Sequence, residues 1–340
     1  MSYAIACQLS PSVVVPRAER GRRVTALSGT RVLVTGAGGF VGPHLVRALV
    51  ERGARVRGAG LGSPPPGTPI EGWSEVDFSE AGQAGSAIDA APLDAVVHLA
   101  GQSSAARSFE APEATFRANV TGTWTLLEAL RQRASRARVL VVSTSEVYGP
   151  IEPGTRAAED REFHPVSPYA LSKAAAEELA RAYAETHGLD VVRARPFGHT
   201  GPGQMPRFVV PSFAQQIAAI EAGRAEPVLR VGDLAVTRDL CDVRDVAEGY
   251  CALLERAPRG AVYNLCRGDG AVLRQVVDQL AAMARVRIRI EVDPARLRPA
   301  DVPWLVGDPA LAARELGWSV RRTLADTLRD VLDDWRARAE

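Results

Sequence analysis

Lysine is almost absent from this sequence. Of its 340 residues, 41 are lysine or arginine, and Lys173 is the one lysine among them. The abundance of arginine, alanine and proline is typical of a GC-rich genome, which explains the arginines without reference to function. It does not explain why one ammonium group is kept at position 173. We therefore expect this position to need a chemistry that a guanidinium cannot supply.

Cysteine is also scarce. Cys7, Cys241, Cys251 and Cys266 lack the spacing of a metal site or of a disulfide framework. We therefore expect reduced thiols, no bound metal and a cytoplasmic location.

The sequence has neither a surplus of charge nor a long apolar run. A formal net charge of +1 indicates no general attraction to nucleic acid. No apolar stretch approaches the roughly 18 residues that a membrane-spanning helix needs, so no membrane association is expected. With 46% hydrophobic and 24% charged residues, the chain can build one large α/β domain or two lobes around an ample core.

The first 28 residues differ from the rest of the chain. In "MSYAIACQLSPSVVVPRAERGRR" the basic residues follow the short apolar stretch, whereas in a secretory signal they precede it. We expect residues 1–28 to form a disordered N-terminal tail. A start codon placed too far upstream is the alternative.

Residues 30–60 combine a strand, a glycine-rich turn, a helix and a second strand. The β-branched run "RVLVT" predicts a strand, and "PHLVRALVERG" has a helical spacing that ends at a glycine. Gly36 permits a tight turn, Gly39 lets the backbone approach a pyrophosphate, and Gly42 lets the helix lie close to the sheet. The amides of the helix N-terminus would face the anion. This context predicts nucleotide binding, with a purely structural turn as the alternative.

Further strands alternate with helices as far as "LDVVRARPF". The pattern predicts an α/β fold with a doubly wound parallel sheet, in which ligands bind at the carboxyl ends of the strands. Three such ends, at 36–42, 100–103 and 143–146, carry small or polar residues. We expect a Rossmann domain over 29–195 and a smaller C-terminal α/β lobe in 196–340, with segments near 238–265 returning to the first domain.

The ordered motifs resemble a known family. "VTGAGGFVG", "HLAG", "NVTGT", "STSEVYG", "YALSK", "ARPFGHTGPGQ" and "RDLCDVRDVA" are similar to the extended short-chain dehydrogenases/reductases, in their sugar-nucleotide epimerase/dehydratase group. The resemblance covers residues 30 to about 335. It implies an NAD(P)-dependent enzyme that acts on nucleotide sugars.

The resemblance implies a role for the single lysine. Tyr169 and Lys173 lie one helical turn apart on one face. Lys173 would hydrogen-bond the nicotinamide ribose and lower the pKa of Tyr169, so that the phenol exchanges a proton. Thr144 resembles the family's catalytic hydroxyl. Glu146 stands where dehydratases carry the base that removes the C5 proton of the sugar, but reductases can carry a glutamate there too, so this residue leaves the reaction open.

The family pattern also implies a set of cofactor contacts. Asp77 with Phe78 would contact the adenine. The second strand, "RVRGAGLG", ends without an acidic residue to bind the ribose 2′-hydroxyl, and Arg55 and Arg57 are not where a 2′-phosphate clamp is expected. NADP is favoured over NAD. The residues assigned to the cofactor are Gly36, Gly39, Phe40, Val41, Gly42, Asp77, Phe78, Leu99, Ala100, Gly101, Asn119, Tyr169, Lys173 and Pro196.

The second half of the chain most resembles reductases of GDP-4-keto-6-deoxymannose. We expect NAD(P)H-dependent reduction of the C4 ketone of a GDP-4-keto-6-deoxyhexose. The alternatives are a 4,6-dehydratase or 4-epimerase with tightly bound cofactor, and a non-catalytic nucleotide-sensing scaffold. Arg238 and Arg298 would clamp the diphosphate, and Gly198 replaces a common asparagine. The residues assigned to the substrate are Ser103, Ser145, Gly198, His199, Gln204, Val209, Arg238 and Arg298.

Two further expectations concern guanine and assembly. Gln204 and Arg207 are candidate donors to guanine, with Gln215 and Glu221 further along, and an ordinary lobe surface is the alternative for all four. The helices near 107–132 and 167–187 carry apolar residues on more than one face. Relatives pair such helices into a four-helix bundle, so a homodimer is expected.

Overall fold

A seven-stranded parallel sheet forms the centre of the larger domain. The computed structural model describes residues 26–133, 135–297 and 302–339. The strand order is β10-β6-β5-β4-β1-β2-β3, with every neighbouring pair parallel. This confirms the predicted α/β fold with a doubly wound sheet. The strands are β1 (Arg31–Thr35), β2 (Arg55–Gly60), β3 (Gly72–Glu75), β4 (Ala95–His98), β5 (Arg138–Val142), β6 (Val191–Pro196) and β10 (Val262–Leu265).

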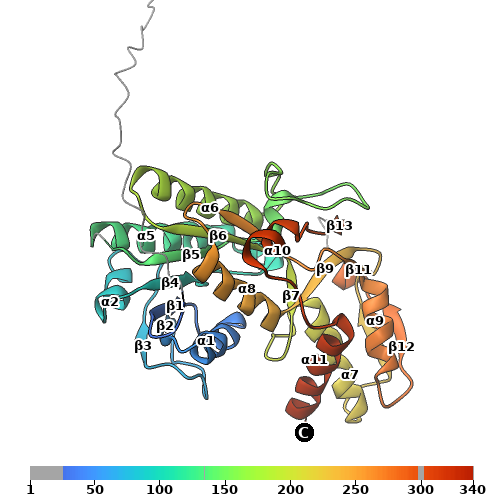
Figure 1. Ribbon diagram of the computed structural model, residues 1–340. Helices are drawn as coiled ribbons and strands as arrows, with labels where there is room; N and C mark the ends of the chain where they lie inside the picture. Colours follow the sequence, from blue (N-terminus) through green and yellow to red (C-terminus); the bar gives the residue numbers. More distant parts are fainter. Residues whose placement is uncertain (1–25, 134, 298–301, 340) are drawn as a thin grey trace, which may run out of the picture.

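Helices cover both faces of this sheet (Figure 1). On one face α1 (Val41–Glu51), α8 (Val243–Arg256) and α10 (Ala310–Leu316) close one hydrophobic core. On the other face α2 (Ala84–Asp89), α5 (Gly122–Gln132) and α6 (Pro168–Thr186) close a second core. The central strands are runs of Val, Leu and Ala because both of their faces are buried. Between β4 and α5 lie α3 (Ala105–Glu110), α4 (Pro112–Phe116) and a π-helical turn, η1 (Arg117–Thr121).

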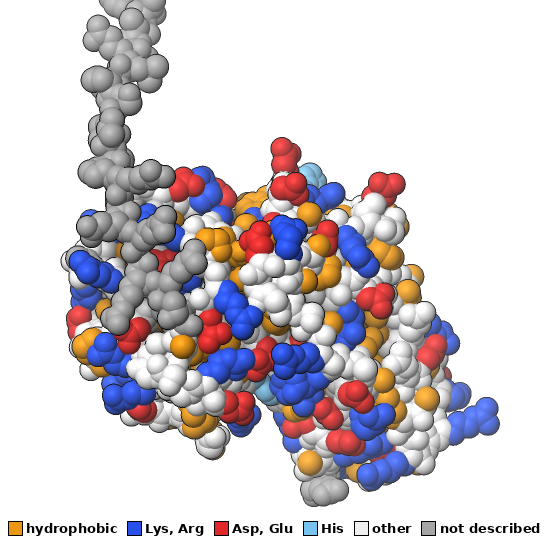
Figure 2. Space-filling view, in the orientation of Figure 1, with side chains coloured by type: hydrophobic (Ala, Val, Ile, Leu, Met, Phe, Trp, Pro, Cys, Tyr) orange, Lys and Arg blue, Asp and Glu red, His pale blue; other side chains and the backbone are white. Residues whose placement is uncertain are grey.

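A smaller lobe is built mainly from the C-terminal third of the chain. Its helices are α7 (Val209–Glu221), α9 (Leu273–Ala282) and α11 (Leu324–Ala339), which share a separate hydrophobic core. Its strands are β7 (Gly198–Thr200), β8 (Val228–Val231), β9 (Thr237–Asp242), β11 (Gly270–Val272), β12 (Arg289–Val292) and β13 (Trp304–Leu305). Two 3-10 turns, η2 (Ser145–Tyr148) and η3 (Pro294–Arg296), complete the described elements. Figure 2 shows an indentation between this lobe and the larger domain.

The described residues place several segments relative to the expected boundaries. Leu27, expected in the tail, is 1% exposed and packs in the core under α1, so the ordered domain begins before residue 29. Residues 1–25, to which the rest of the tail prediction applies, lie outside the described residues, as does Arg298. The chain after the lobe strands returns to the larger domain through α8, β10 and also α10.

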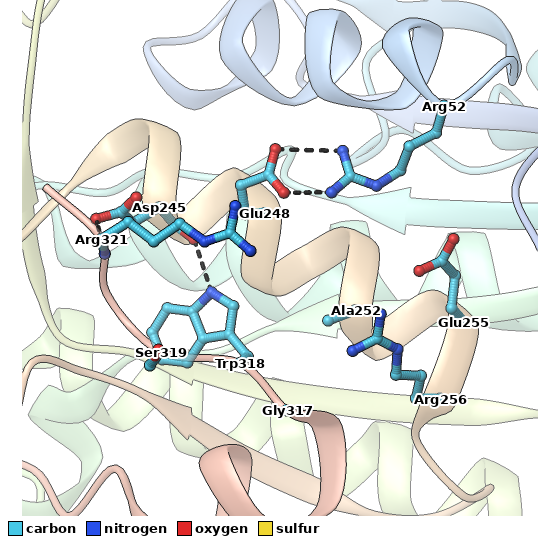
Figure 3. A pocket seen from close by; sticks show the side chains of 10 residues that line it. All are labelled: Arg52, Asp245, Glu248, Ala252, Glu255, Arg256, Gly317, Trp318, Ser319 and Arg321. Carbon is cyan, nitrogen blue, oxygen red and sulfur yellow. Dashed lines mark hydrogen bonds and ion pairs between the residues drawn. The ribbon is translucent and has the colours of Figure 1, made fainter.

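A hollow lined by charged side chains lies at the far end of α1 (Figure 3). Arg52 at the end of α1 pairs with Glu248 of α8, and Trp318 donates from its indole nitrogen to the Asp245 carbonyl at 2.9 Å. Asp245 also accepts from the Arg321 amide at 2.9 Å. These contacts fasten the segment after α10 to α8. An eleven-residue helix is about 16 Å long, so this hollow is remote from the glycine-rich turn at the start of α1.

Candidate active site

The glycine-rich turn joins β1 to α1 at the carboxyl edge of the sheet. Gly36 has φ 67°, and a Cβ there would stand 2.6 Å from the Ala100 amide nitrogen, so no larger residue fits. A Cβ at Gly42 would overlap the Ala37 carbonyl. The turn therefore lies directly against the end of β4, where Leu99, Ala100 and Gly101 are partly or fully exposed. Phe40 and Val41, at the start of α1, are also partly exposed.

A chain of buried hydrogen bonds runs from this turn to helix α6. His98 Nδ1 lies 2.8 Å from the Thr35 hydroxyl and its Nε2 lies 3.2 Å from the Thr123 hydroxyl. Since the Thr123 hydroxyl donates to the Asn119 carbonyl, His98 must donate to it from Nε2 and accept at Nδ1. Burial and the nearby Lys173 charge lower the pKa of His98 to about 3, which keeps the imidazole neutral.

Asn119 sits on the π-helical turn and completes this chain. Its side-chain amide donates to the Ser172 hydroxyl at 2.9 Å and to the Gln102 carbonyl at 3.1 Å, and its oxygen accepts from the Gln102 amide at 2.8 Å. Ser172 in turn donates to the Tyr169 carbonyl at 2.7 Å. The family pattern assigns Asn119 to the cofactor, but its whole amide is engaged within the protein. It acts on the site by holding the loop after β4 against α6.

Helix α6 begins with strong local signals. The Ser167 side chain accepts from the Ala170 amide, and Pro168 occupies the first helical position. Tyr169 therefore lies in the first turn of α6, 8% exposed. It shares a hydrogen bond with Thr144, and the charge of Glu146 is close enough to act on it. The structure thus brings together Tyr169, Thr144 and Glu146 from α6 and the end of β5.

The pKa of Tyr169 differs from the sequence-based expectation. Burial raises it, Glu146 raises it further, and the hydrogen bond with Thr144 lowers it by less. Lys173 is not among the groups that shift this pKa in the ligand-free protein, so its predicted effect on Tyr169 stays a prediction for the protein with its ligands bound. The Lys173 ammonium donates to the Val142 carbonyl, and burial lowers the lysine pKa to about 8. The phenol is therefore held in its protonated form.

The predicted adenine contacts are only partly available. Asp77 Oδ1 accepts from the Ser79 amide at 2.9 Å and from the Ser79 hydroxyl at 2.7 Å. The Phe78 ring is 4% exposed and packs edge-on against His98 with ring centroids 6.0 Å apart. Phe78 can therefore offer a ligand its backbone but not its ring, because the ring belongs to the core under α2 and α5.

Two predicted substrate residues follow β6 and connect the domains. Gly198 is exposed, and a Cβ there would stand 2.7 Å from the Asp239 carbonyl oxygen. The close approach of β7 to β9 thus leaves little room for a side chain at this position. His199 donates from Nδ1 toward the Phe197 carbonyl at 2.9 Å and stacks on Phe40 with centroids 6.1 Å apart. Pro196, at the end of β6, is buried.

A contact that the sequence did not reveal ties the glycine-rich turn to the lobe. His44 Nε2 lies 2.9 Å from the Pro202 carbonyl, and the His44 ring packs edge-on against Phe40. Burial lowers the pKa of His44 and of His199. Both imidazoles are thus neutral, and they pack between the first turn of α1 and the lobe. The residues "GPH" at the end of the glycine motif do not predict this contact, because the partner of His44 is 158 residues away in the sequence.

Gln204 is not available to bind guanine as the sequence predicts. It is 5% exposed, accepts from the Thr200 hydroxyl at 2.7 Å and donates to the His199 carbonyl at 3.2 Å. Glu221 likewise pairs with Arg336 at 2.8 Å and joins α7 to α11. Both side chains stabilise the lobe. Arg207 and Gln215 are exposed.

The other substrate candidates lie around the same edge. Arg238 on β9 donates to the Thr237 carbonyl at 2.9 Å and to the Val302 carbonyl at 2.5 Å, which fixes its guanidinium against β13. Ser145 is buried in the 3-10 turn after β5, Ser103 is exposed, and Val209 is partly exposed at the start of α7.

Comparison with known proteins gives this arrangement a family. The family model for GDP-mannose 4,6 dehydratase matches residues 33–331. The chain is 38% identical to GDP-6-deoxy-D-mannose reductase of Pseudomonas aeruginosa, over 91% of this chain and 98% of that protein. It is 33% identical to dTDP-glucose 4,6-dehydratase of Streptomyces antibioticus, over 90% and 92%.

Solved structures give the same result. The structure of RMD from Pseudomonas aeruginosa complexed with NADPH superposes with a TM-score of 0.79 at 36% identity, covering 91% of this chain and 99% of that one. UDP-glucose 4-epimerase of Thermus thermophilus in complex with NAD gives 0.81 at 31% identity, covering 90% and 99%. The chain therefore belongs to the GDP-mannose 4,6-dehydratase family, within the extended short-chain dehydrogenases/reductases.

Proposed function

We propose that this protein reduces the C4 ketone of a GDP-4-keto-6-deoxyhexose with NADPH or NADH. The observation that carries the proposal is the placement of a protonated phenol, Tyr169, beside the Thr144 hydroxyl at the end of β5, one helical turn from the lysine. The similarity to a GDP-6-deoxy-D-mannose reductase over nearly the whole chain supports this choice of substrate.

The residues present fit a dinucleotide. The backbone approach at Gly36 leaves no room for a side chain, and Gly38 and Gly39 stay open at the N-terminus of α1, where amides attract a pyrophosphate. Lys173 is one turn from Tyr169 and would hold the nicotinamide ribose hydroxyls. The nicotinamide, when bound, supplies the hydride.

The chain's own groups account for the proton. The Thr144 and Tyr169 hydroxyls would hold the C4 carbonyl oxygen of the sugar by hydrogen bonds. As the hydride adds to C4, the phenol donates its proton to that oxygen, so the ketone becomes an alcohol and Tyr169 becomes a phenolate. The Lys173 ammonium stabilises the phenolate, which then recovers a proton from water. The raised pKa of free Tyr169 suits this direction, because the phenol is protonated when the substrate arrives.

A dehydratase or epimerase is the second candidate, and Glu146 is the observation that favours it. Its carboxylate lies near Tyr169 and would be placed to remove a C5 proton. Cofactor consumption separates the two functions: a reductase oxidises one NAD(P)H per sugar reduced, whereas a dehydratase or epimerase returns the hydride within each turnover.

The deciding experiment mixes the purified protein with GDP-4-keto-6-deoxymannose and NADPH. The proposal expects a loss of NADPH absorbance that matches the amount of alcohol formed. Conversion of GDP-mannose or a UDP-sugar without net cofactor oxidation would replace it with the second candidate. Among diphosphates we expect GDP to bind at least about tenfold more tightly than UDP or dTDP, roughly 1.4 kcal/mol, by calorimetry.

We further propose that the enzyme is a homodimer that works in the cytoplasm. Phe109, Trp124 and Leu171 expose 55%, 44% and 49% of their surface on the neighbouring elements α3, α5 and α6. Such a cluster is typical of a protein interface, and a second copy related by a two-fold axis would cover it with the same helices.

The three cysteines in the described residues are free and buried, which fits a reducing compartment. None of the helices in the described residues is long and apolar enough to span a membrane.

A further inference from the structure

Trp73 occupies an unusual position beside the glycine-rich turn. It lies on the edge strand β3, directly opposite Gly58 of β2 in the parallel register. A Cβ built on Gly58 would stand 2.7 Å from the indole Cε3, and one built on Gly60 would stand 3.5 Å from its Cη2. The indole therefore packs against the last residues of β2, and at Gly58 it leaves no room for a side chain.

The same ring reaches the turn itself. A Cβ on Gly38 would stand 3.7 Å from the indole Cη2. The indole nitrogen donates to the Gly62 carbonyl at 2.7 Å, which fixes the loop after β2. Trp73 thus contacts both the glycine-rich turn and the end of β2, and part of its surface remains exposed.

In dinucleotide-binding folds the adenosine ribose lies between the glycine-rich turn and the end of the second strand. The pyrophosphate lies at the glycine-rich turn, and a residue at the end of the second strand contacts the ribose 2′ position, through a carboxylate for NAD or a basic residue for NADP. Residues 58–70, "GAGLGSPPPGTPI", contain neither. The nearest carboxylate in register is Glu75, opposite Gly60 and one strand further from the turn.

We propose that Trp73 forms the wall of the adenosine-ribose subsite, where its indole edge packs against the 2′ side of the ribose in place of a charged group. It is thus a binding residue for the adenosine half of the cofactor and does not itself distinguish NADP from NAD. The inference rests on the cofactor-binding part of the proposed function and not on the identity of the sugar. Apolar contact with a rigid ring stabilises the ribose whether or not it carries a phosphate.

The test uses adenosine 2′,5′-bisphosphate and AMP, which contain the adenosine half alone. In the wild type each probe should change tryptophan fluorescence, and Trp73→Phe should abolish most of that change, whereas Trp335→Phe on α11 should retain it. Trp73→Ala should weaken both probes at least about fivefold by calorimetry while the affinity for GDP stays the same. If Trp73→Ala fails to fold, Trp73→Leu serves for the same measurement.

The outcomes separate this inference from the broader function. Unchanged affinity for both probes in the Trp73 variants, or a fluorescence change that persists in Trp73→Phe, would overturn the role of Trp73 alone. Failure of the wild type to bind either probe, or NADPH, would overturn the cofactor-binding function itself.

Discussion

The identity of one side chain, Lys173, limits what the site can do. Its ammonium is partly buried, donates to the Val142 carbonyl and lies one turn from Tyr169. A guanidinium keeps the charge but is planar and broader, and it would not fit the space that we propose for the ammonium between the ribose and the phenol. Although the composition favours arginine, position 173 is therefore a lysine because the size and shape of the side chain matter there.

Replacing Lys173 tests this argument directly. We expect Lys173→Arg to lower kcat at least about tenfold, because the geometry changes although the charge is kept. Tyr169→Phe should lose more activity with little change in NADPH affinity, because only the proton donor is removed. Steady-state kinetics with a binding assay checks both. Near-normal turnover of Lys173→Arg would contradict the argument, and a large affinity loss in Tyr169→Phe would indicate a structural role for the phenol.

The titration of Lys173 gives a second prediction. Burial lowers its pKa to about 8 in the free protein, so the ammonium is present at pH 7 and is lost as the pH rises through 8. If the ammonium holds the ribose, the dissociation constant of NADPH should be flat from about pH 6 to 7.5 and then rise, by at most about tenfold per pH unit. Lys173→Met should bind more weakly at pH 7 and show no such rise. A rise that persists in Lys173→Met would assign it to another group.

At the scale of single residues the sequence predicted chemistry better than contacts. Tyr169, Lys173 and Thr144 were identifiable because their spacing repeats a family pattern. Gln204 was assigned wrongly because its two internal partners, Thr200 and the His199 carbonyl, depend on how one turn folds. The buried His98 was missed, since Thr35 and Thr123 come from different elements and no local pattern brings them together.

Among the elements, α6 is fixed to the sheet by a buried ion pair. Glu177 has no exposed surface and accepts from Arg195 of β6 at 2.7 and 2.9 Å. Arg195 also donates to the Tyr148 hydroxyl and to the Glu159 carbonyl, each at 2.8 Å. The contact lies one turn beyond Lys173, so it sets the position of the catalytic face of the helix.

Breaking this pair should destabilise the protein strongly. Glu177→Gln keeps the shape but leaves the Arg195 guanidinium buried without a counter-charge, which costs about 3–5 kcal/mol of unfolding free energy. Urea denaturation measures the loss. The matched control is Glu178→Gln: Glu178 pairs at the surface with Arg181 at 2.8 Å, and an exposed pair contributes at most about 1 kcal/mol. Equal losses for the two variants would show that the buried pair does not anchor α6.

The positions of the regular elements could be predicted from hydrophobic periodicity, but one irregular element could not be predicted in this way. The strands were predicted from β-branched and alternating apolar runs, and a helix was predicted near 167–187, where α6 lies. The π-helical turn at Arg117–Thr121 was not, because its cause is tertiary: the Asn119 amide must face Gln102 and Ser172 at once. The sequence around it is compatible with an ordinary helix.

For the whole molecule, the α/β class with a parallel, doubly wound sheet was the most predictable feature. Parallel strands that alternate with helices allow few topologies, and the glycine-rich turn identifies the first strand. How the C-terminal chain divides between the lobes was harder to predict. Helix α10 packs against α8 and β10 in the larger domain, although its sequence has no feature that distinguishes it from the helices of the smaller lobe. Such long-range packing depends on which apolar faces of elements distant in the sequence pack against each other.

The same reasoning applies to the outer face formed by α3, α4, η1, α5 and α6. Phe116, Val120 and Trp124 succeed one another at helical spacing and are partly or well exposed, and Leu171 and Ala175 continue the apolar surface on α6. In a monomer this surface would remain in water. Burying it at about 25 cal/mol per Å² favours association, and because the surface includes α6, a second copy would also restrain the helix that carries Tyr169 and Lys173.

We therefore expect a homodimer at micromolar concentration, measured by light scattering. Leu171→Asp places a charge at the centre of the proposed interface, so it should shift the protein to monomer and reduce turnover without removing any catalytic group. Val292→Asp on β12, where the valine is 62% exposed in the smaller lobe, is the matched control and should remain a dimer with normal turnover. A wild-type monomer, or a Leu171→Asp variant that stays dimeric, would show that this apolar face has another partner or none. A monomeric Leu171→Asp variant with full activity would leave the interface in place but remove its proposed role in holding α6.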